Sequence, residues 1–260
     1  MKVSLIRHGV ATYNETEKTR DRDNAKDLDP LKLISLKSQA TDFVKKLDSN
    51  DSVTIWSSPI PRSLETSKIF EEAIAEAGIP IRKIGIFDVF EEARGFKWEY
   101  LSGLVLGTPV MIGGVSVPVD KQITNPTGTS VSEYFRTSPW SQFTPETLEA
   151  LGAFGPIVES MEPYEAIVAR VSRSLEKLKK ISDKQHHLLI FTHQCCTDFV
   201  IEAVNDYKNG GIQPGEAVSL MIRGEKIFIE ETPFGNADNA EILTNQVKEK
   251  TSETIDQVSR

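Results

Sequence analysis

Four side chains suited to binding a phosphoryl group occupy similar places in this sequence. His8 and His193 each come just after a short apolar run, while Arg7 lies at the end of such a run and Arg62 at a turn before a predicted helix. The carboxyl ends of strands in an α/β sheet meet at one edge, so we expect these residues to converge. Guanidinium groups match the oxygens of a phosphoryl group. The pattern predicts an anion site built from two imidazoles and two guanidinium groups.

Two further features are expected to support this anion site. Asn14 would add a neutral hydrogen-bond donor. A helix that opens after Pro61 would direct backbone N–H groups and the positive end of its dipole to the same place.

Apolar runs and helical periodicity alternate along the chain, which predicts an α/β fold. We expect a three-layer α/β/α sandwich with a mostly parallel central sheet. Strands are predicted at 3–6, 53–56, 81–87 and 188–192, helices at 36–47, 61–77, 164–178 and 197–204, and a hairpin at 217–222 and 226–231.

The stretch from Ser102 to Pro163 interrupts this alternation and is rich in Gly, Pro, Ser and Thr. A bare loop of that length is uncommon inside a compact domain, so we interpret residues 100–160 as a cap inserted over the site, where substrate specificity should reside. We expect a catalytic domain over residues 1–235. Residues 236–260 are predicted to be a polar tail or a frayed helix, because no aromatic residue follows Phe234.

The composition excludes several classes of protein. The chain has 260 residues, 30 Lys plus Arg against 38 Asp plus Glu, and a formal net charge of -8, which argues against a general nucleic-acid binder. No apolar stretch is long enough for a membrane helix, and no secretory signal is recognisable at the start. The two cysteines, Cys195 and Cys196, are adjacent, which disfavours a disulfide and favours a reducing compartment. We therefore expect a cytoplasmic protein.

The sequence resembles the histidine phosphatase superfamily, whose fold is shared by cofactor-dependent phosphoglycerate mutases and many phosphomonoesterases. The resemblance covers most of residues 1–232, apart from the insertion. It rests on Arg7-His8-Gly9 with Asn14, on the segment from Ser57 to Arg62 with Thr66, on Glu91 and Glu92 with Gly95 and Trp98-Glu99, and on Thr192-His193.

This resemblance implies a phosphatase that hydrolyses small phosphate monoesters without a metal or other cofactor. His8 would attack phosphorus and become phosphohistidine, which water then hydrolyses. Arg7, Arg62 and His193 would hold the phosphoryl oxygens, with Asn14 and the backbone N–H of Gln194 as further donors. The attacking nitrogen of His8 must be unprotonated, so a backbone carbonyl near Gly9 is expected to hold the proton on the other ring nitrogen.

The family acid, which protonates the leaving oxygen, corresponds to Glu91 or Glu92. Counting back from Trp98 favours Glu92, whereas counting back from Gly95 favours Glu91. We favour Glu92 slightly.

Two segments depart from the family pattern and leave alternatives open. Val10-Ala11 replaces a polar acid or amide followed by Thr or Ser, and Gln194-Cys195-Cys196 replaces a small, Gly-rich stretch. The mutases usually carry glutamate at the position of Val10, so its absence counts against mutase activity. The alternatives are a phosphoglycerate mutase-like phosphotransferase and a non-catalytic phospholigand-binding protein.

Two other chemistries fit the residues less well. His186 and His187 are adjacent, and neighbouring side chains of an extended chain point to opposite faces, which disfavours a metal site. A thiol phosphatase would need an arginine a few residues after its cysteine, but Arg223 is the first one after Cys196.

Overall fold

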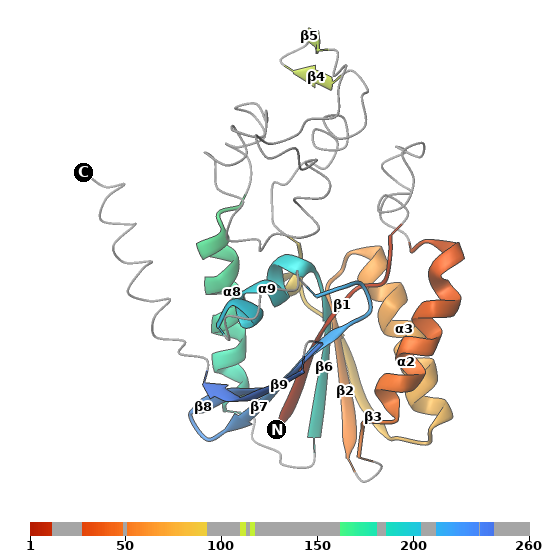
Figure 1. Ribbon diagram of the computed structural model, residues 1–260, viewed down its shortest axis with the longest axis vertical. Helices are drawn as coiled ribbons and strands as arrows, with labels where there is room; N and C mark the ends of the chain where they lie inside the picture. Colours follow the sequence, from red (N-terminus) through yellow and green to blue (C-terminus); the bar gives the residue numbers. More distant parts are fainter. Residues whose placement is uncertain are drawn as a thin grey trace, which may run out of the picture.

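The computed structural model describes residues 1–11, 28–48, 51–92, 110–112, 115–117, 162–180, 186–203, 212–233 and 235–241. Figure 1 shows one sheet with helices on both of its faces. The α/β fold and its three layers are therefore confirmed.

The main sheet has seven strands in the order β3-β2-β6-β1-β7-β8-β9. The four strands from β3 to β1 are parallel neighbours, and the last three extend the sheet in antiparallel fashion. The strands are β1 (Lys2–Arg7), β2 (Ser52–Ser57), β3 (Ile81–Ile86), β6 (His186–Thr192), β7 (Ala217–Arg223), β8 (Lys226–Thr232) and β9 (Gly235–Glu241). A separate antiparallel pair consists of β4 (Val110–Ile112) and β5 (Val115–Val117).

Among the described residues, helices cover both faces of the sheet (Figure 1). Helices α2 (Leu33–Val44) and α3 (Pro61–Glu76) cover one face, and α8 (Tyr164–Leu178) and α9 (Gln194–Ala203) cover the other. Short 3-10 helices, η2 (Pro30–Lys32) and η3 (Asp88–Phe90), precede α2 and follow β3.

The central strands are buried on both faces, as expected of parallel strands between helices. In β6, Leu189 and Phe191 belong to the core beneath α2 and α3, with Phe70 of α3 packed edge-on against Phe191. Leu188 and Ile190 alternate with them and are also buried. This double burial fixes the register of the strands whose ends carry the predicted site.

The carboxyl ends of β1, β2 and β6 lie side by side. Arg7 is the register partner of Thr192, and Ser57 is the partner of Phe191. Beyond the strands, the His8 amide donates to the Thr192 carbonyl at 2.9 Å, and the Ser58 amide donates to the Phe191 carbonyl at 2.9 Å. The sheet therefore delivers residues from three distant parts of the sequence to one edge.

Three predicted elements differ from the structure by three residues or more. Helix α2 spans Leu33–Val44 rather than 36–47. Helix α9 begins at Gln194, three residues before the predicted start at Thr197, and the Thr197 hydroxyl donates to the Gln194 carbonyl at 2.8 Å. Strand β9 occupies 235–241, so ordered sheet extends into the segment predicted as a tail or frayed helix.

The cap predicted for residues 100–160 lies outside the described residues apart from β4 and β5. None of the helices that the structure describes has the length and apolar character needed to span a bilayer.

Candidate active site

His8 lies directly after β1, and its two ring nitrogens have different partners. The Nδ1 atom lies 2.7 Å from the Gly9 carbonyl oxygen, and the Arg62 Nε–H donates to Nε2 at 3.0 Å. A carbonyl can only accept, so Nδ1 carries the proton and Nε2 presents a lone pair. The Gly9 carbonyl is the kind of acceptor that the sequence predicted, and the structure assigns it to Nδ1.

The surroundings of His8 disfavour its protonated form. Its side chain is buried, and burial together with the charges of Arg62 and Arg7 holds the pKa of His8 well below its usual 6.5. The Gly9 carbonyl opposes this effect only in part. The ring is therefore neutral at physiological pH, as a nucleophile must be.

His193 lies just after β6, with its ring centroid 5.1 Å from that of His8. Its Nε2 lies 3.0 Å from Ser58 Oγ and 3.3 Å from Ser63 Oγ, while Nδ1 lies 3.2 Å from Arg62 Nη2. Burial and the nearby Arg62 charge lower the pKa of His193 well below 6.5. The structure thus brings the two predicted histidines together, both in the neutral form.

Arg62 joins the groups of this site. It occupies the first turn of α3, which opens with Pro61 at a position where a missing N–H costs nothing. Its guanidinium contacts His8, His193 and the Glu92 carboxylate, and only 3% of the residue is exposed. One buried cation therefore connects two imidazoles with an acid.

The turn that carries His8 is held against α3 and α2. The Gly9 amide donates to Thr66 Oγ1 at 2.9 Å, and the Thr66 hydroxyl donates to the Arg62 carbonyl at 2.7 Å. A Cβ atom at Gly9 would lie 2.6 Å from a methyl group of Leu36, so glycine permits this close approach. These contacts fix His8 relative to Arg62.

The two candidate acids have different surroundings. The Glu92 carboxylate forms an ion pair with Arg62, and 12% of its side chain is exposed. Glu91 offers its backbone carbonyl to Arg170 at 2.7 Å. The structure therefore places the Glu92 carboxylate at the histidine pair.

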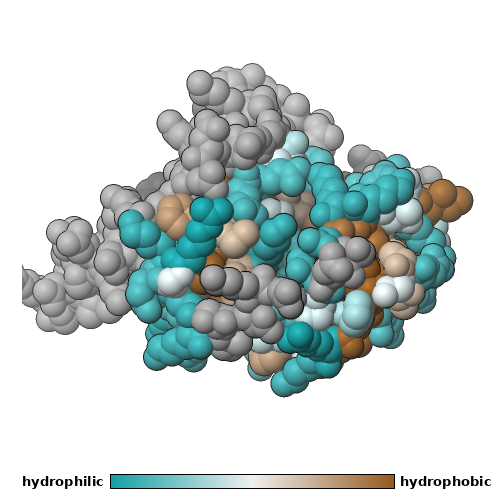
Figure 2. Space-filling view, turned by 90° about the horizontal axis from the view of Figure 1, so that it is seen from below, coloured by the Kyte–Doolittle hydropathy of each residue, from teal (hydrophilic) through white to brown (hydrophobic). Residues whose placement is uncertain are grey.

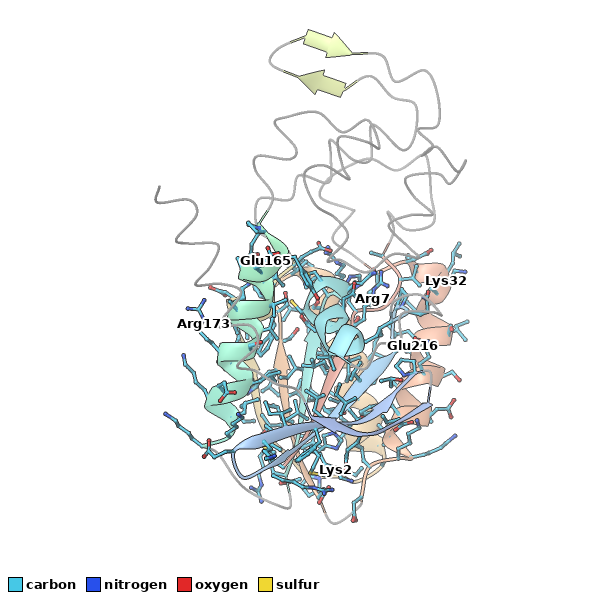
Figure 3. All side chains as sticks on the ribbon, turned by 60° about the vertical axis from the view of Figure 1, so that its left-hand side comes forward. Lys2, Arg7, Lys32, Glu165, Arg173 and Glu216 are labelled. Atoms are coloured by element: carbon cyan, nitrogen blue, oxygen red, sulfur yellow. The ribbon has the colours of Figure 1, made fainter. Side chains whose placement is uncertain are left out.

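Arg7 reaches the site from the side of β7. Its Nη1 donates to the Ile212 carbonyl at 2.6 Å, and its charge contributes to lowering the pKa of both His8 and His193. Within the described part of the chain, its Nε is buried without a hydrogen-bond partner. Figure 3 shows Arg7 at the opposite end of β1 from Lys2.

The remaining predicted donors are Asn14 and Gln194. Asn14 lies outside the described residues. Gln194 is the first residue of α9, next to His193, and its side-chain nitrogen is buried without a partner among the described residues. With two guanidinium groups, two neutral imidazoles and one carboxylate, the site has a net positive charge and suits an anion.

Neither the Cys195 thiol nor the histidine at the start of β6 is placed for this chemistry. Burial raises the pKa of the Cys195 thiol well above its usual range, which disfavours a thiolate nucleophile. His187 lies at the start of β6, where its Nε2 is 2.9 Å from Ser4 Oγ. No group of three or more His, Cys, Asp or Glu suited to a metal ion occurs in the described ranges.

Three contributors were not predicted. Ser58 and Ser63 flank the predicted Arg62 turn, and a hydroxyl next to that motif was the available signal. Arg170 holds the backbone of Glu91 and Glu92. Its signal was a cation within the buried apolar stripe of α8, between Ile167 and Val171.

Comparisons with known proteins place this arrangement in context. No protein-family model and no curated protein matches the chain. Among solved structures, a phosphoglycerate mutase from Bacillus anthracis is similar at 13% identity with a TM-score of 0.56, over 95% of this chain and 96% of that one.

Two further solved structures have the same fold. A mycobacterial glucosyl-3-phosphoglycerate phosphatase in complex with VO3 is 13% identical with a TM-score of 0.51, over 88% of this chain and 97% of that one. YhfR from Bacillus stearothermophilus is 15% identical with a TM-score of 0.51, over 88% and 94%. The chain therefore shares the fold of these structures, which is the fold that the resemblance of its motifs implied.

Proposed function

We propose that this protein hydrolyses small phosphate monoesters through a phosphohistidine on His8. The observation that supports this most strongly is the single buried guanidinium of Arg62, which contacts both imidazoles and the Glu92 carboxylate. A phosphoryl group bound to Arg62 would lie next to the lone pair of His8 Nε2, which accepts from the Arg62 Nε–H in the free protein. It would also lie beside a carboxyl group able to exchange a proton.

The first step transfers the phosphoryl group to the protein. His8 Nε2 attacks phosphorus, the bond from phosphorus to the ester oxygen breaks, and the protonated form of Glu92 gives its proton to the leaving alcohol. Water then attacks phosphorus and transfers a proton to Glu92. The P–N bond breaks, which releases inorganic phosphate and restores His8.

The cationic groups stabilise the charge that the equatorial oxygens carry during both steps. Arg62 and Arg7 are held by backbone and side-chain partners before any ligand arrives. In the free protein the Glu92 carboxylate and His8 Nε2 occupy donors of Arg62. A phosphoryl group would take the place of both on Arg62.

The proposed activity is tested by assaying a panel of aryl and alkyl phosphates with the parent protein and with His8→Ala. We expect phosphate release by the parent and a loss on the order of 10³-fold or more in the variant, because the nucleophile is removed. His186→Ala is the matched control, since His186 lies at the far end of β6 and contacts Ser52. It should retain parental activity.

Other outcomes identify the alternatives. Unchanged hydrolysis by His8→Ala would contradict the nucleophile. Isomerisation of 3-phosphoglycerate without release of phosphate from the panel would indicate a phosphoglycerate mutase-like phosphotransferase. Saturable binding of phosphate esters without turnover by the parent would indicate a non-catalytic phospholigand-binding protein.

A further inference from the structure

Arg170 is a buried cation that the proposed chemistry does not use directly. It belongs to the core-facing side of α8 and is 8% exposed. Burying a guanidinium costs free energy unless its N–H donors are paired. The partners of Arg170 therefore show which groups hold it in the interior.

The guanidinium joins two segments that are far apart in sequence. Its Nε and Nη2 donate to the two oxygens of the Glu162 carboxylate at 3.0 and 3.2 Å. The opposite side of the fork donates to three backbone carbonyls: Nη1 to Val89 at 2.5 Å, and Nη2 to Glu91 at 2.7 Å and Glu92 at 3.2 Å.

Those three carbonyls belong to the segment that presents the proposed acid. The 3-10 helix η3 ends with the Glu91 amide bonded to the Asp88 carbonyl at 3.0 Å, and Glu92 follows outside the described helices and strands. Two uncharged contacts accompany Arg170 there: the Thr192 hydroxyl donates to the Phe90 carbonyl at 2.8 Å, and Cys196 Sγ lies 3.3 Å from the Glu91 carbonyl. Arg170 is thus the charged group that holds the backbone of Glu92 itself.

We propose that Arg170 is a positioning residue that places the Glu92 carboxyl for proton transfer to the leaving oxygen. This inference rests on the proposed phosphatase function. Proton transfer requires the carboxyl within about 2.6–3.2 Å of that oxygen, and a displacement of about 1 Å can cost roughly 10²-fold in rate. A planar fork with five donors can hold Glu162 and three carbonyls together, whereas the single ammonium of lysine cannot.

Comparing leaving groups separates a positioning role from a purely structural one, because a purely structural defect would lower the rate on every ester equally. An alkyl alkoxide needs the proton from Glu92, whereas the p-nitrophenolate ion leaves readily without it. We expect Arg170→Lys to lose about 10- to 100-fold in kcat/KM on the alkyl phosphate that the parent hydrolyses fastest. The loss in kcat/KM on p-nitrophenyl phosphate should be only a few-fold, because kcat/KM reports the transfer of the phosphoryl group to His8 and not the later hydrolysis of phosphohistidine, which both esters share.

Arg173→Lys is the matched control. Arg173 is an exposed residue of the same helix, and its Nε donates to the Ala169 carbonyl within that helix. Figure 3 shows its side chain on the outer side of α8. This variant should leave activity on both esters unchanged.

A second background tests whether Arg170 acts through Glu92. In Glu92→Gln protein, adding Arg170→Lys should cause no further loss on the alkyl ester, because the group that it positions is already gone. Glu162→Gln, which weakens the anchor but keeps Arg170, should reproduce the leaving-group effect more weakly. If Arg170→Lys fails to fold, the Glu162→Gln variant alone tests the proposal.

Two results would overturn the role of Arg170 while the parent remains an active phosphatase. One is an equal loss in kcat/KM on the alkyl and aryl esters in both Arg170→Lys and Glu162→Gln. The other is a full additional loss in the Glu92→Gln background. A parent that hydrolyses no ester would instead overturn the proposed function, and the role of Arg170 with it.

Discussion

At the scale of single residues, the two nitrogens of the His8 ring have different partners and different roles. Because Nδ1 faces the Gly9 carbonyl, the proton stays there, and Nε2 lies beside Arg62, where an anion would bind. The sequence predicted an acceptor near Gly9, because a nucleophilic imidazole needs one to hold the proton on its other nitrogen, but it did not say which nitrogen that is. The requirement is local, and the residue that meets it is the next one in the chain.

The choice between Glu91 and Glu92 is a non-local question, and counting along the sequence left it open. The side-chain directions follow from how the backbone after η3 is held, and Arg170 holds it from 78 residues away in sequence, counted to Glu92. The spacing of residues around Glu91 and Glu92 contains no information about their contact with Arg170. A cation on the apolar side of a predicted helix was the only available signal.

Glu92→Gln and Glu91→Gln form a matched pair that tests the acid. We expect Glu92→Gln to lose about 10²-fold or more in kcat on alkyl phosphates, because it cannot donate the proton. Glu91→Gln should stay within a few-fold of the parent. Steady-state assays on the same ester panel measure both variants, and a larger loss for Glu91→Gln would assign the acid to Glu91 instead.

At the scale of secondary structure, strongly patterned elements were predictable. The apolar runs became β1, β2 and β6, and the pattern from Pro61 to the Gly78-Ile79-Pro80 stop became α3. Gly78 has a φ of 72°, the left-handed conformation that ends a helix. These elements were identified because local propensity and burial agree.

The missed elements are those whose local pattern conflicts with their surroundings. Thr197 looks like a helix N-cap, but its hydroxyl bonds backward to Gln194, which is already helical. Strand β9 contains Asn, Asp, Ala and Gly rather than β-branched or aromatic residues, and pairs with β8 at the edge of the sheet. Its pairing comes from backbone hydrogen bonds that sequence periodicity does not record.

His187, near the start of β6, makes the free energy of unfolding depend on pH. Burial, with the nearby charges of Lys2, His186 and the N-terminus, lowers the pKa of His187 from 6.5 to about 4. The unfolded chain therefore binds a proton more readily, so the free energy of unfolding falls as pH drops from about 6.5 toward 4. The contribution of His187 over this window is about 3 kcal/mol.

His187→Gln isolates this contribution, because an amide can keep a hydrogen bond with Ser4 and does not titrate. We expect the stabilities of parent and variant to converge, or cross, as the pH falls from 7 to 4. Urea unfolding at several pH values measures this. Parallel curves for the two proteins would show that His187 does not titrate between these limits.

At the scale of the whole molecule, strand order explains why residues 185 positions apart meet. Strand β1 lies between β6 and β7, so the turns after β1 and β6 are neighbours. Arg170 connects the Glu92 backbone with the Glu162 carboxylate, and so joins two segments of the described chain that are 70 residues apart in sequence.

The charge of the molecule is arranged unevenly. The chain carries a formal net charge of -8, yet the site brings two arginines toward one carboxylate. Figure 2 views the molecule from below, at the end of the sheet remote from the site, where the described surface is mostly hydrophilic with a few hydrophobic patches. A local positive site on an acidic protein favours a small anion over an extended polyanion such as nucleic acid.

The most direct test of the proposed phosphohistidine is to quench the protein during turnover of a labelled phosphate ester. Phosphorus NMR and peptide mapping then identify the phosphorylated atom. The account predicts phosphate on Nε2 of His8, because Nδ1 is held by the Gly9 carbonyl. Phosphate on Nδ1 of His8, phosphate on His193, or turnover without any phosphorylated histidine would contradict it.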